Sequence, residues 1–172
     1  HMTYKLIAVT GVTRGLGSVL TNWLIAQGKT VVGCARSQSG IDALGARFPG
    51  PHRFDVLDIT SSEDVKTWAR SVIETNGVPD LVINNASICN DASKRSWELS
   101  DEEFAMVMAV NINGTANVCR AFLPAMVERG QGTVIGLSSR AGRKGLANLA
   151  PYCAGKWAIE GMMKAIAREL LE

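Results

Sequence analysis

The stretch Thr10-Gly-Val-Thr-Arg-Gly-Leu-Gly17 (TGVTRGLG) decides how this chain folds. It follows an apolar run typical of a buried strand, and it precedes a segment whose apolar residues recur at helical spacing. Glycine weakens regular structure, so three glycines between a predicted strand and a predicted helix require a reason. A turn that brings backbone N–H groups close to a phosphate, at the positive end of a helix, supplies one. A plain tight turn would also explain the glycines, but the flanking strand and helix favour the phosphate-binding interpretation.

Composition narrows the possible classes of protein. The chain has 172 residues, of which 47% are hydrophobic, so we expect one folded domain over residues 1–172. The net charge of +2 gives no reason to expect nucleic acid or an acidic membrane surface as a partner. No apolar run approaches the roughly 20 residues of a membrane span. The first two residues, His1-Met2, suggest a cloning remnant rather than a signal peptide.

The rest of the chain alternates between strand and helix patterns. The apolar strands are continuous, which is typical of a parallel sheet covered by helices on both faces. We therefore predict an α/β fold, a Rossmann-type doubly wound parallel sheet of about five strands. Strands are predicted over residues 5–10, 30–34, 52–56, 80–84 and 132–138. Helices are predicted over residues 16–28 and 39–47. Two more begin at the capping boxes Thr60/Glu63 and Ser100/Glu103, and the second of these is expected to bend near Pro124. A last helix runs up to Leu170.

The glycine spacing TGxxxGxG resembles that of the short-chain dehydrogenase/reductase family in its compact single-domain form. Further matches follow in the family's order: Asn84-Asn85-Ala86 after the fourth strand, Asn111 on the long helix, and Ser139 after the fifth strand. Tyr152 and Lys156 then form a YxxxK motif thirteen residues after Ser139. YxxxK alone arises often by chance, whereas the ordered set covers nearly the whole chain.

The resemblance implies a catalytic role for four residues. Tyr152 would be the general acid and base, and Lys156, one helical turn away, would favour its phenolate and hold the nicotinamide ribose. Ser139 would donate a hydrogen bond to the substrate oxygen, and its choice over the neighbouring Ser138 rests on the family spacing to Tyr152. Asn111 would hold a water that relays protons to Lys156. Each could instead be an ordinary surface or locally bonded residue, and no metal site is predicted.

The resemblance also implies a set of cofactor-binding residues. The glycine turn would bind the pyrophosphate, Asp55 would bind the adenine amino group, and Val56 would pack beside the adenine ring. The predicted set is Gly11, Thr13, Arg14, Gly15, Leu16, Gly17, Arg36, Asp55, Val56, Asn85, Ala86, Tyr152 and Lys156.

The end of the second strand indicates which cofactor is bound. An acidic residue there typically reads the ribose 2′-hydroxyl of NAD, but Ala35 occupies that place and Arg36 follows it. Arg14, in the glycine turn, should face the same ribose. Two arginines match the charge and geometry of a 2′-phosphate, so NADP is predicted in preference to NAD. The alternative is that both arginines are solvated surface charges.

The chain departs from the family pattern in two places. Ser87 stands where the family has a glycine after Asn84-Asn85-Ala86, and we expect a local adjustment there. The sequence also ends near the predicted end of the Tyr152 helix, before the family's last two strands and substrate loop. We expect a fragment of a longer reductase, although a naturally short protein would look the same. The fifth strand would then form a sheet edge.

Two classes of function follow. The first is an NADP-dependent oxidoreductase that interconverts a carbonyl and a secondary alcohol on a small molecule. The second is a catalytically silent NADP-binding domain that acts as a sensor or assembly partner. The four scattered cysteines suggest reduced thiols and a cytoplasmic location. Association as a homodimer or homotetramer is expected by resemblance, with Ile159, Met163 and Ile166 as candidate contacts unless they belong to the core.

Overall fold

The computed structural model describes residues 3–171, so His1, Met2 and Glu172 lie outside the described part of the chain. A parallel sheet of five strands forms its centre, in the order β3-β2-β1-β4-β5. The strands are β1 (Leu6–Thr10), β2 (Thr30–Ala35), β3 (Arg53–Val56), β4 (Leu81–Asn84) and β5 (Thr133–Gly136). The predicted fold class is confirmed, and β5 forms one edge of the sheet.

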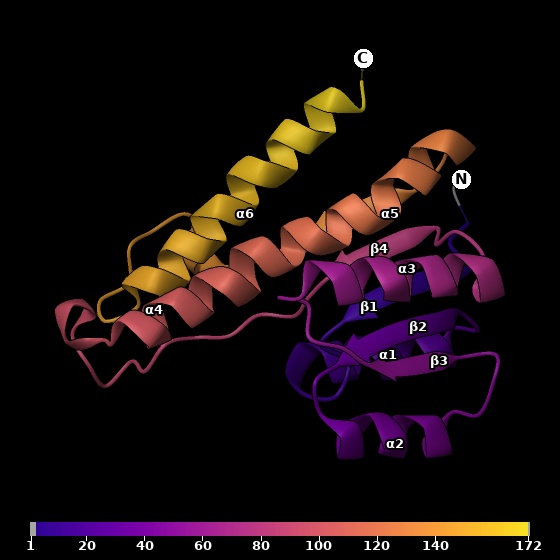
Figure 1. Cartoon of the computed structure of the whole chain (residues 1–172), viewed down its shortest axis with the longest axis horizontal. Coiled ribbons are helices and arrows are strands. Elements are labelled where there is room, and N and C mark those ends of the chain that lie inside the picture. The colour runs from indigo at the N-terminus through magenta and orange to yellow at the C-terminus, as the bar shows by residue number, and fades with distance from the viewer. Residues whose placement is uncertain (1–2, 172) are drawn as a thin grey trace.

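Helices cover both faces of this sheet (Figure 1). Helices α4 and α5 are joined through a π-helical segment, η2, into one long helix that runs beside α6 (Figure 1). The α-helices are α1 (Gly15–Ala26), α2 (Gln38–Arg47), α3 (Ser62–Asn76), α4 (Asp101–Met108), α5 (Thr115–Arg129) and α6 (Ala150–Glu169). The shorter segments are η1 (Ser96–Glu98), η2 (Ala109–Gly114) and η3 (Arg140–Gly142).

Alternate residues of β1 enter two separate cores. Ile7 and Val9 of β1 pack with Leu24 of α1 and Ile41 of α2 on one face. Ala8, between them in the sequence, packs on the other face with side chains of α3 and α5, such as those of Trp68 and Phe122. Because successive strand residues point to opposite faces, the continuous apolar runs are explained by burial on both sides.

The strand order places the functional region. β1 lies between β2 and β4, so the chain leaves β1 toward one side of the sheet and later returns to the other side. In open α/β sheets, ligands bind outside the carboxyl ends of the strands at such a switch point. The glycine stretch follows β1 at this point, and the segments after β2, β4 and β5 begin beside it.

Two helices differ locally from their prediction. The predicted cap at Thr60 was wrong by one residue: Ser61 caps α3 by accepting a hydrogen bond from the Asp64 amide, because the Thr60 hydroxyl donates to Asp58 instead. The cap at Ser100 is confirmed. Pro124 lies inside α5, and the interruption that the long helix does show is the π segment η2; a bend at Pro124 stays a prediction.

Candidate nucleotide-binding and catalytic site

The turn after β1 folds tightly against the segment after β4. Gly11 has φ of +75°, a left-handed conformation that favours glycine, and a Cβ there would lie 2.9 Å from the Asn85 amide nitrogen. A Cβ on Gly17 would overlap the Gly11 carbonyl oxygen. These two glycines are therefore required for the backbone to pack on itself, and they keep side chains out of the turn.

Asn85 and Thr10 hold the two segments together. The Asn85 amide nitrogen donates to the carbonyl oxygens of Thr10 at 2.9 Å and Gly11 at 3.2 Å. In return, the Thr10 hydroxyl accepts from the backbone N–H groups of Asn85 at 3.1 Å and Ala86 at 3.0 Å. Thr10 was not among the predicted site residues, although a hydroxyl directly before the first glycine was visible in the sequence.

A cavity of about 850 Å³ opens above this turn, at the carboxyl ends of the strands. It lies within the size range of small-molecule and cofactor sites, which is roughly 300–1,000 Å³. Most of the predicted cofactor-binding residues line it. They are Gly11, Thr13, Arg14, Gly15, Leu16, Arg36, Asn85, Ala86, Tyr152 and Lys156.

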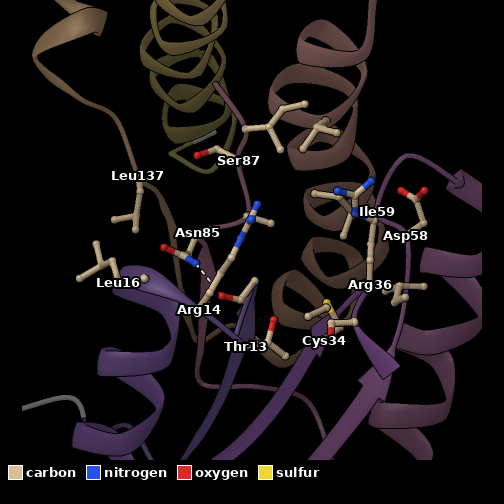
Figure 2. Close-up of a pocket in the computed structure, with 18 of the residues that line it drawn as sticks. Thr13, Arg14, Leu16, Cys34, Arg36, Asp58, Ile59, Asn85, Ser87 and Leu137 are labelled. Atoms are coloured by element: carbon tan, nitrogen blue, oxygen red, sulfur yellow. Dashed lines mark hydrogen bonds between the residues drawn. The ribbon is translucent and has the colours of Figure 1, made fainter. Parts of the chain in front are cut away.

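Arg14 and Arg36 both line this cavity and are exposed. Figure 2 shows the two side chains extending in the same direction, Arg14 from the start of α1 and Arg36 from the end of β2. Neither guanidinium has an acidic partner within 4 Å among residues 3–171. Two unneutralised positive charges at one end of a cavity favour an anionic ligand group there.

Lys156 is buried beneath Tyr152. Its ammonium nitrogen donates to the Leu137 carbonyl oxygen at 2.8 Å and lies 5.6 Å from the centre of the Tyr152 ring. Only 5% of the residue is exposed, and desolvation lowers the pKa of the ammonium from its usual 10.5. Both side chains line the cavity, so the tyrosine and the lysine face the same space.

Asn111 lies in η2 and is 1% exposed. Its side-chain oxygen accepts from the Ile88 amide and its side-chain nitrogen donates to the Ile88 carbonyl, both at 2.8 Å. The asparagine therefore fixes the segment after β4 against the long helix. Asn111 does not line the cavity, although Ile88 does.

Comparison with known proteins agrees with the fold described above. The family model described as short chain dehydrogenase matches residues 5–172. The chain belongs to the short-chain dehydrogenase family. The resemblance deduced from the motifs is confirmed.

Several members of the family are similar over almost all of this chain. An NADPH-dependent pterin aldehyde reductase of Arabidopsis thaliana is 44% identical over 98% of this chain and 70% of its own length. A 3-oxoacyl-(acyl-carrier-protein) reductase of Haemophilus influenzae is 30% identical over 98% of this chain and 69% of its own. These relatives are named reductases, which supports an oxidoreductase enzyme.

Solved structures of short-chain dehydrogenases have the same fold as this chain. A metagenomic short-chain oxidoreductase in complex with NADP superposes with a TM-score of 0.90 at 29% identity, covering 98% of this chain and 77% of that one. A short-chain dehydrogenase from Streptomyces avermitilis superposes with a TM-score of 0.91 at 31% identity, but this chain covers only 61% of it.

The structure does not bring the predicted adenine-binding residues of this short-chain dehydrogenase to the cavity. Asp55 lies on β3, where its carboxylate accepts from Arg53 at 2.6 Å and from the Trp68 indole at 2.9 Å. Val56 does not line the cavity either, whereas Asp58 and Ile59 do (Figure 2). Of these two aspartates, which lie three residues apart, only Asp58 lines the cavity.

Of Gly17, Ser139 and Ser87, only Ser87 lines the cavity. Gly17 lies beneath the turn rather than at the cavity surface. Ser139 does not line the cavity; its hydroxyl caps η3 by accepting from the Ala141 amide at 3.0 Å, whereas Ser138 does line it. Ser87 also lines the cavity with a negative φ, so serine fits where the family has glycine without strained backbone.

The described residues form neither a metal site nor a membrane-spanning helix. No three His, Cys, Asp or Glu side chains within residues 3–171 group in a way that could bind a metal. All four cysteines are free thiols, and burial raises the pKa of Cys34 to about 12, which keeps that thiol protonated. None of the helices described here has the length and apolar character needed to cross a bilayer.

Proposed function

We propose that this protein is an NADP-dependent reductase that interconverts a small-molecule carbonyl and the corresponding secondary alcohol. The observation that carries the proposal is that Tyr152 and Lys156 line the same cavity as the glycine turn and the two unpaired arginines. One cavity thus combines a proton donor with a site for a charged dinucleotide.

The residues present fit NADP. The glycine turn leaves backbone free to approach a pyrophosphate at the start of α1, and Arg14 and Arg36 carry the charge that a 2′-phosphate requires. Asp58 and Ile59, rather than Asp55 and Val56, would contact the adenine. When bound, NADPH supplies the hydride for reduction.

Tyr152 would provide the proton. During reduction, its phenol donates a proton to the substrate oxygen, and in the reverse direction its phenolate accepts one. The nearby Lys156 ammonium stabilises the phenolate, and its desolvation strengthens this effect because fewer waters screen the charge. Ser139 would donate a hydrogen bond to the same substrate oxygen as negative charge develops on it.

Asn111 would act through its backbone in the proton relay. Both polar atoms of its side chain are engaged by Ile88, so a relay water would have to bind the Asn111 carbonyl oxygen. The Thr115 hydroxyl donates to that oxygen at 3.1 Å, and a carbonyl oxygen can accept a further hydrogen bond.

The test is NADPH consumption with a panel of aldehydes and ketones. The panel includes a pterin aldehyde, because the Arabidopsis relative is named for that substrate. We expect turnover that falls by at least about 100-fold in Tyr152→Phe, a substitution that removes the proton and keeps the ring. Tight NADPH binding without any Tyr152-dependent turnover would instead support a silent NADP-binding domain.

The same proposal includes the protein's surroundings. We expect a homodimer or homotetramer associated through the long helix and α6, and a cytoplasmic location, for which the free thiols are the supporting observation. Sedimentation analysis of the purified protein tests the first expectation.

A further inference from the structure

Two segments on the catalytic side of the cavity are joined by two asparagines. One segment follows β4 and contains Ser87 and Ile88, which line the cavity. The other leads into α6 and thus to Tyr152. Asn90 of the first segment and Asn148 of the second make the hydrogen bonds that connect them.

The contacts between these segments are reciprocal. The Asn90 amide nitrogen donates to the Asn148 carbonyl oxygen at 2.8 Å, and the Asn148 amide nitrogen donates to the Ala92 carbonyl oxygen at 3.0 Å. An Arg95 guanidinium nitrogen lies 3.5 Å from the Asn148 side-chain oxygen. Asn90 is only 5% exposed, so its hydrogen bond is largely protected from competition by water.

The backbone at Asn148 is also unusual. Its φ of +64° makes it the one non-glycine residue with a positive φ among residues 3–171. Asparagine tolerates this left-handed conformation better than most residues, so a single side chain meets both the conformational and the hydrogen-bonding requirement.

This connection lies close to Tyr152 in the chain, since Asn148 precedes Tyr152 by four residues. Tyr152 is the third residue of α6, and Leu149, which precedes the helix, makes no side-chain cap. The first turn of α6 is therefore not fixed by a cap, and Asn148 stands directly before Leu149. Across the connection, the segment after β4 is itself fixed, because Asn111 holds Ile88 and Thr10 holds Asn85.

We propose that Asn90 and Asn148 form a clamp that positions Tyr152 relative to the cavity wall at Ser87 and Ile88. Both are positioning residues: they act through Tyr152 and do not contact the reacting atoms. The inference rests on the proposed reductase function, because it assigns a purpose to the position of the proton donor. A misplacement of about 1 Å in such a group can reduce turnover by about 100-fold.

Kinetics provide the first test. Asn148→Gly keeps the positive φ and removes both side-chain contacts, and Asn90→Ala removes the donor from the other side. We expect each variant to lower kcat by about tenfold or more while the Kd for NADPH stays within about twofold. Asn148→Asp, which retains the oxygen facing Arg95 and tolerates a positive φ, should recover part of kcat. Asn76→Gly at the end of α3 is the matched control and should change neither value.

A spectroscopic measurement separates this proposal from the proposed function. The chain contains two tyrosines, so ¹³C-labelled tyrosine gives two ring signals, and Tyr152→Phe identifies which belongs to Tyr152. We expect Asn148→Gly and Asn90→Ala to shift or broaden the Tyr152 signal and leave the Tyr4 signal unchanged. If the wild-type protein reduces no carbonyl, the proposed function fails and this signal still decides the clamp.

Two results would overturn the proposal that these asparagines position Tyr152. An unchanged Tyr152 signal in both variants would show that the asparagines do not position the ring. A loss of kcat matched by an equal loss of NADPH affinity would mean general damage to the fold and would also overturn the proposal.

Discussion

The ammonium nitrogen of Lys156 lies 5.6 Å from the centre of the Tyr152 ring and donates a 2.8 Å hydrogen bond to the Leu137 carbonyl oxygen. This relationship connects the last helix to the segment after β5 at the floor of the cavity. It also buries a positive charge, and desolvation lowers the pKa of Lys156 as a result.

The buried lysine should make stability depend on pH. Because its pKa is lower in the folded protein than the 10.5 of an exposed lysine, the unfolded chain binds more protons between the two values. The free energy of unfolding contributed by this group therefore rises with pH up to about 10.5. Urea denaturation between pH 7 and 10 measures this effect. The free energy of unfolding of the wild type, minus that of Lys156→Met, should increase with pH. Lys66→Met, at an exposed site on α3, should show no such trend, and a flat difference for Lys156 would refute the desolvation argument.

Arg14 and Arg36 should decide between the two nicotinamide cofactors. A hydrogen bond to a charged group contributes about 1.5–3 kcal/mol, so Arg14→Ala with Arg36→Ala should weaken NADPH binding by at least about 100-fold. NADH lacks the 2′-phosphate, and its affinity should change by less than about threefold. Fluorescence titration with each cofactor measures both values. Arg70→Ala on α3 is the exposed control, and equal losses for NADPH and NADH would contradict the assignment.

The aspartates Asp55 and Asp58 should differ in their effect on NADPH binding. Asp58→Ala, at the cavity, should weaken NADPH binding by about fivefold or more, because it removes an acceptor for the adenine amino group. Asp55→Ala should leave NADPH affinity nearly unchanged and lower the free energy of unfolding by about 1–3 kcal/mol, because it leaves Arg53 and the Trp68 indole without their shared acceptor. Titration and urea denaturation of both variants check the pair. The reverse pattern would restore the original prediction for Asp55.

The difference between these two aspartates could not be predicted from their local sequence. All five predicted strands are present, and the continuous apolar signal was clearest for β1, β2 and β4, which are buried on both faces. This signal could not decide which side chain reaches the cavity after β3, since that depends on where the strand ends. Asp55 is still in β3 and meets Trp68 of α3, whereas Asp58 follows the strand and faces the cavity.

The tertiary partners of polar side chains could not be predicted from the sequence either. Asn111 was recognised by its motif, but its pairing with Ile88 joins residues 23 positions apart. The connection between Asn90 and Asn148 spans 58 positions and leaves no local pattern in the sequence. Motif spacing predicted the candidate catalytic residues, and only the packed structure could identify the contacts that hold them in place.

Gly17 should tolerate no side chain. A Cβ there would overlap the Gly11 carbonyl oxygen, so Gly17→Ala must displace the turn or the start of α1. We expect a loss of about 3 kcal/mol in the free energy of unfolding, together with a loss of NADPH binding. Gly45→Ala is the control: nothing lies within 4 Å of a Cβ there, and alanine in helix α2 should stabilise the protein by about 0.5–1 kcal/mol. A Gly17→Ala protein with normal stability would show that the turn is less tightly packed than described.

The adjacent serines Ser138 and Ser139 should differ sharply in their effect on turnover. Ser139→Ala should lower kcat by about 100-fold, because it removes a donor to the developing oxyanion, and should retain NADPH binding. It also removes the cap of η3, which should cost about 1 kcal/mol of stability. Ser138→Ala should keep kcat within about threefold. Measuring kcat, the Kd for NADPH and the unfolding midpoint for both variants separates catalysis from capping. If Ser138→Ala lost turnover and Ser139→Ala did not, the substrate donor would be Ser138, the serine that lines the cavity in the structure.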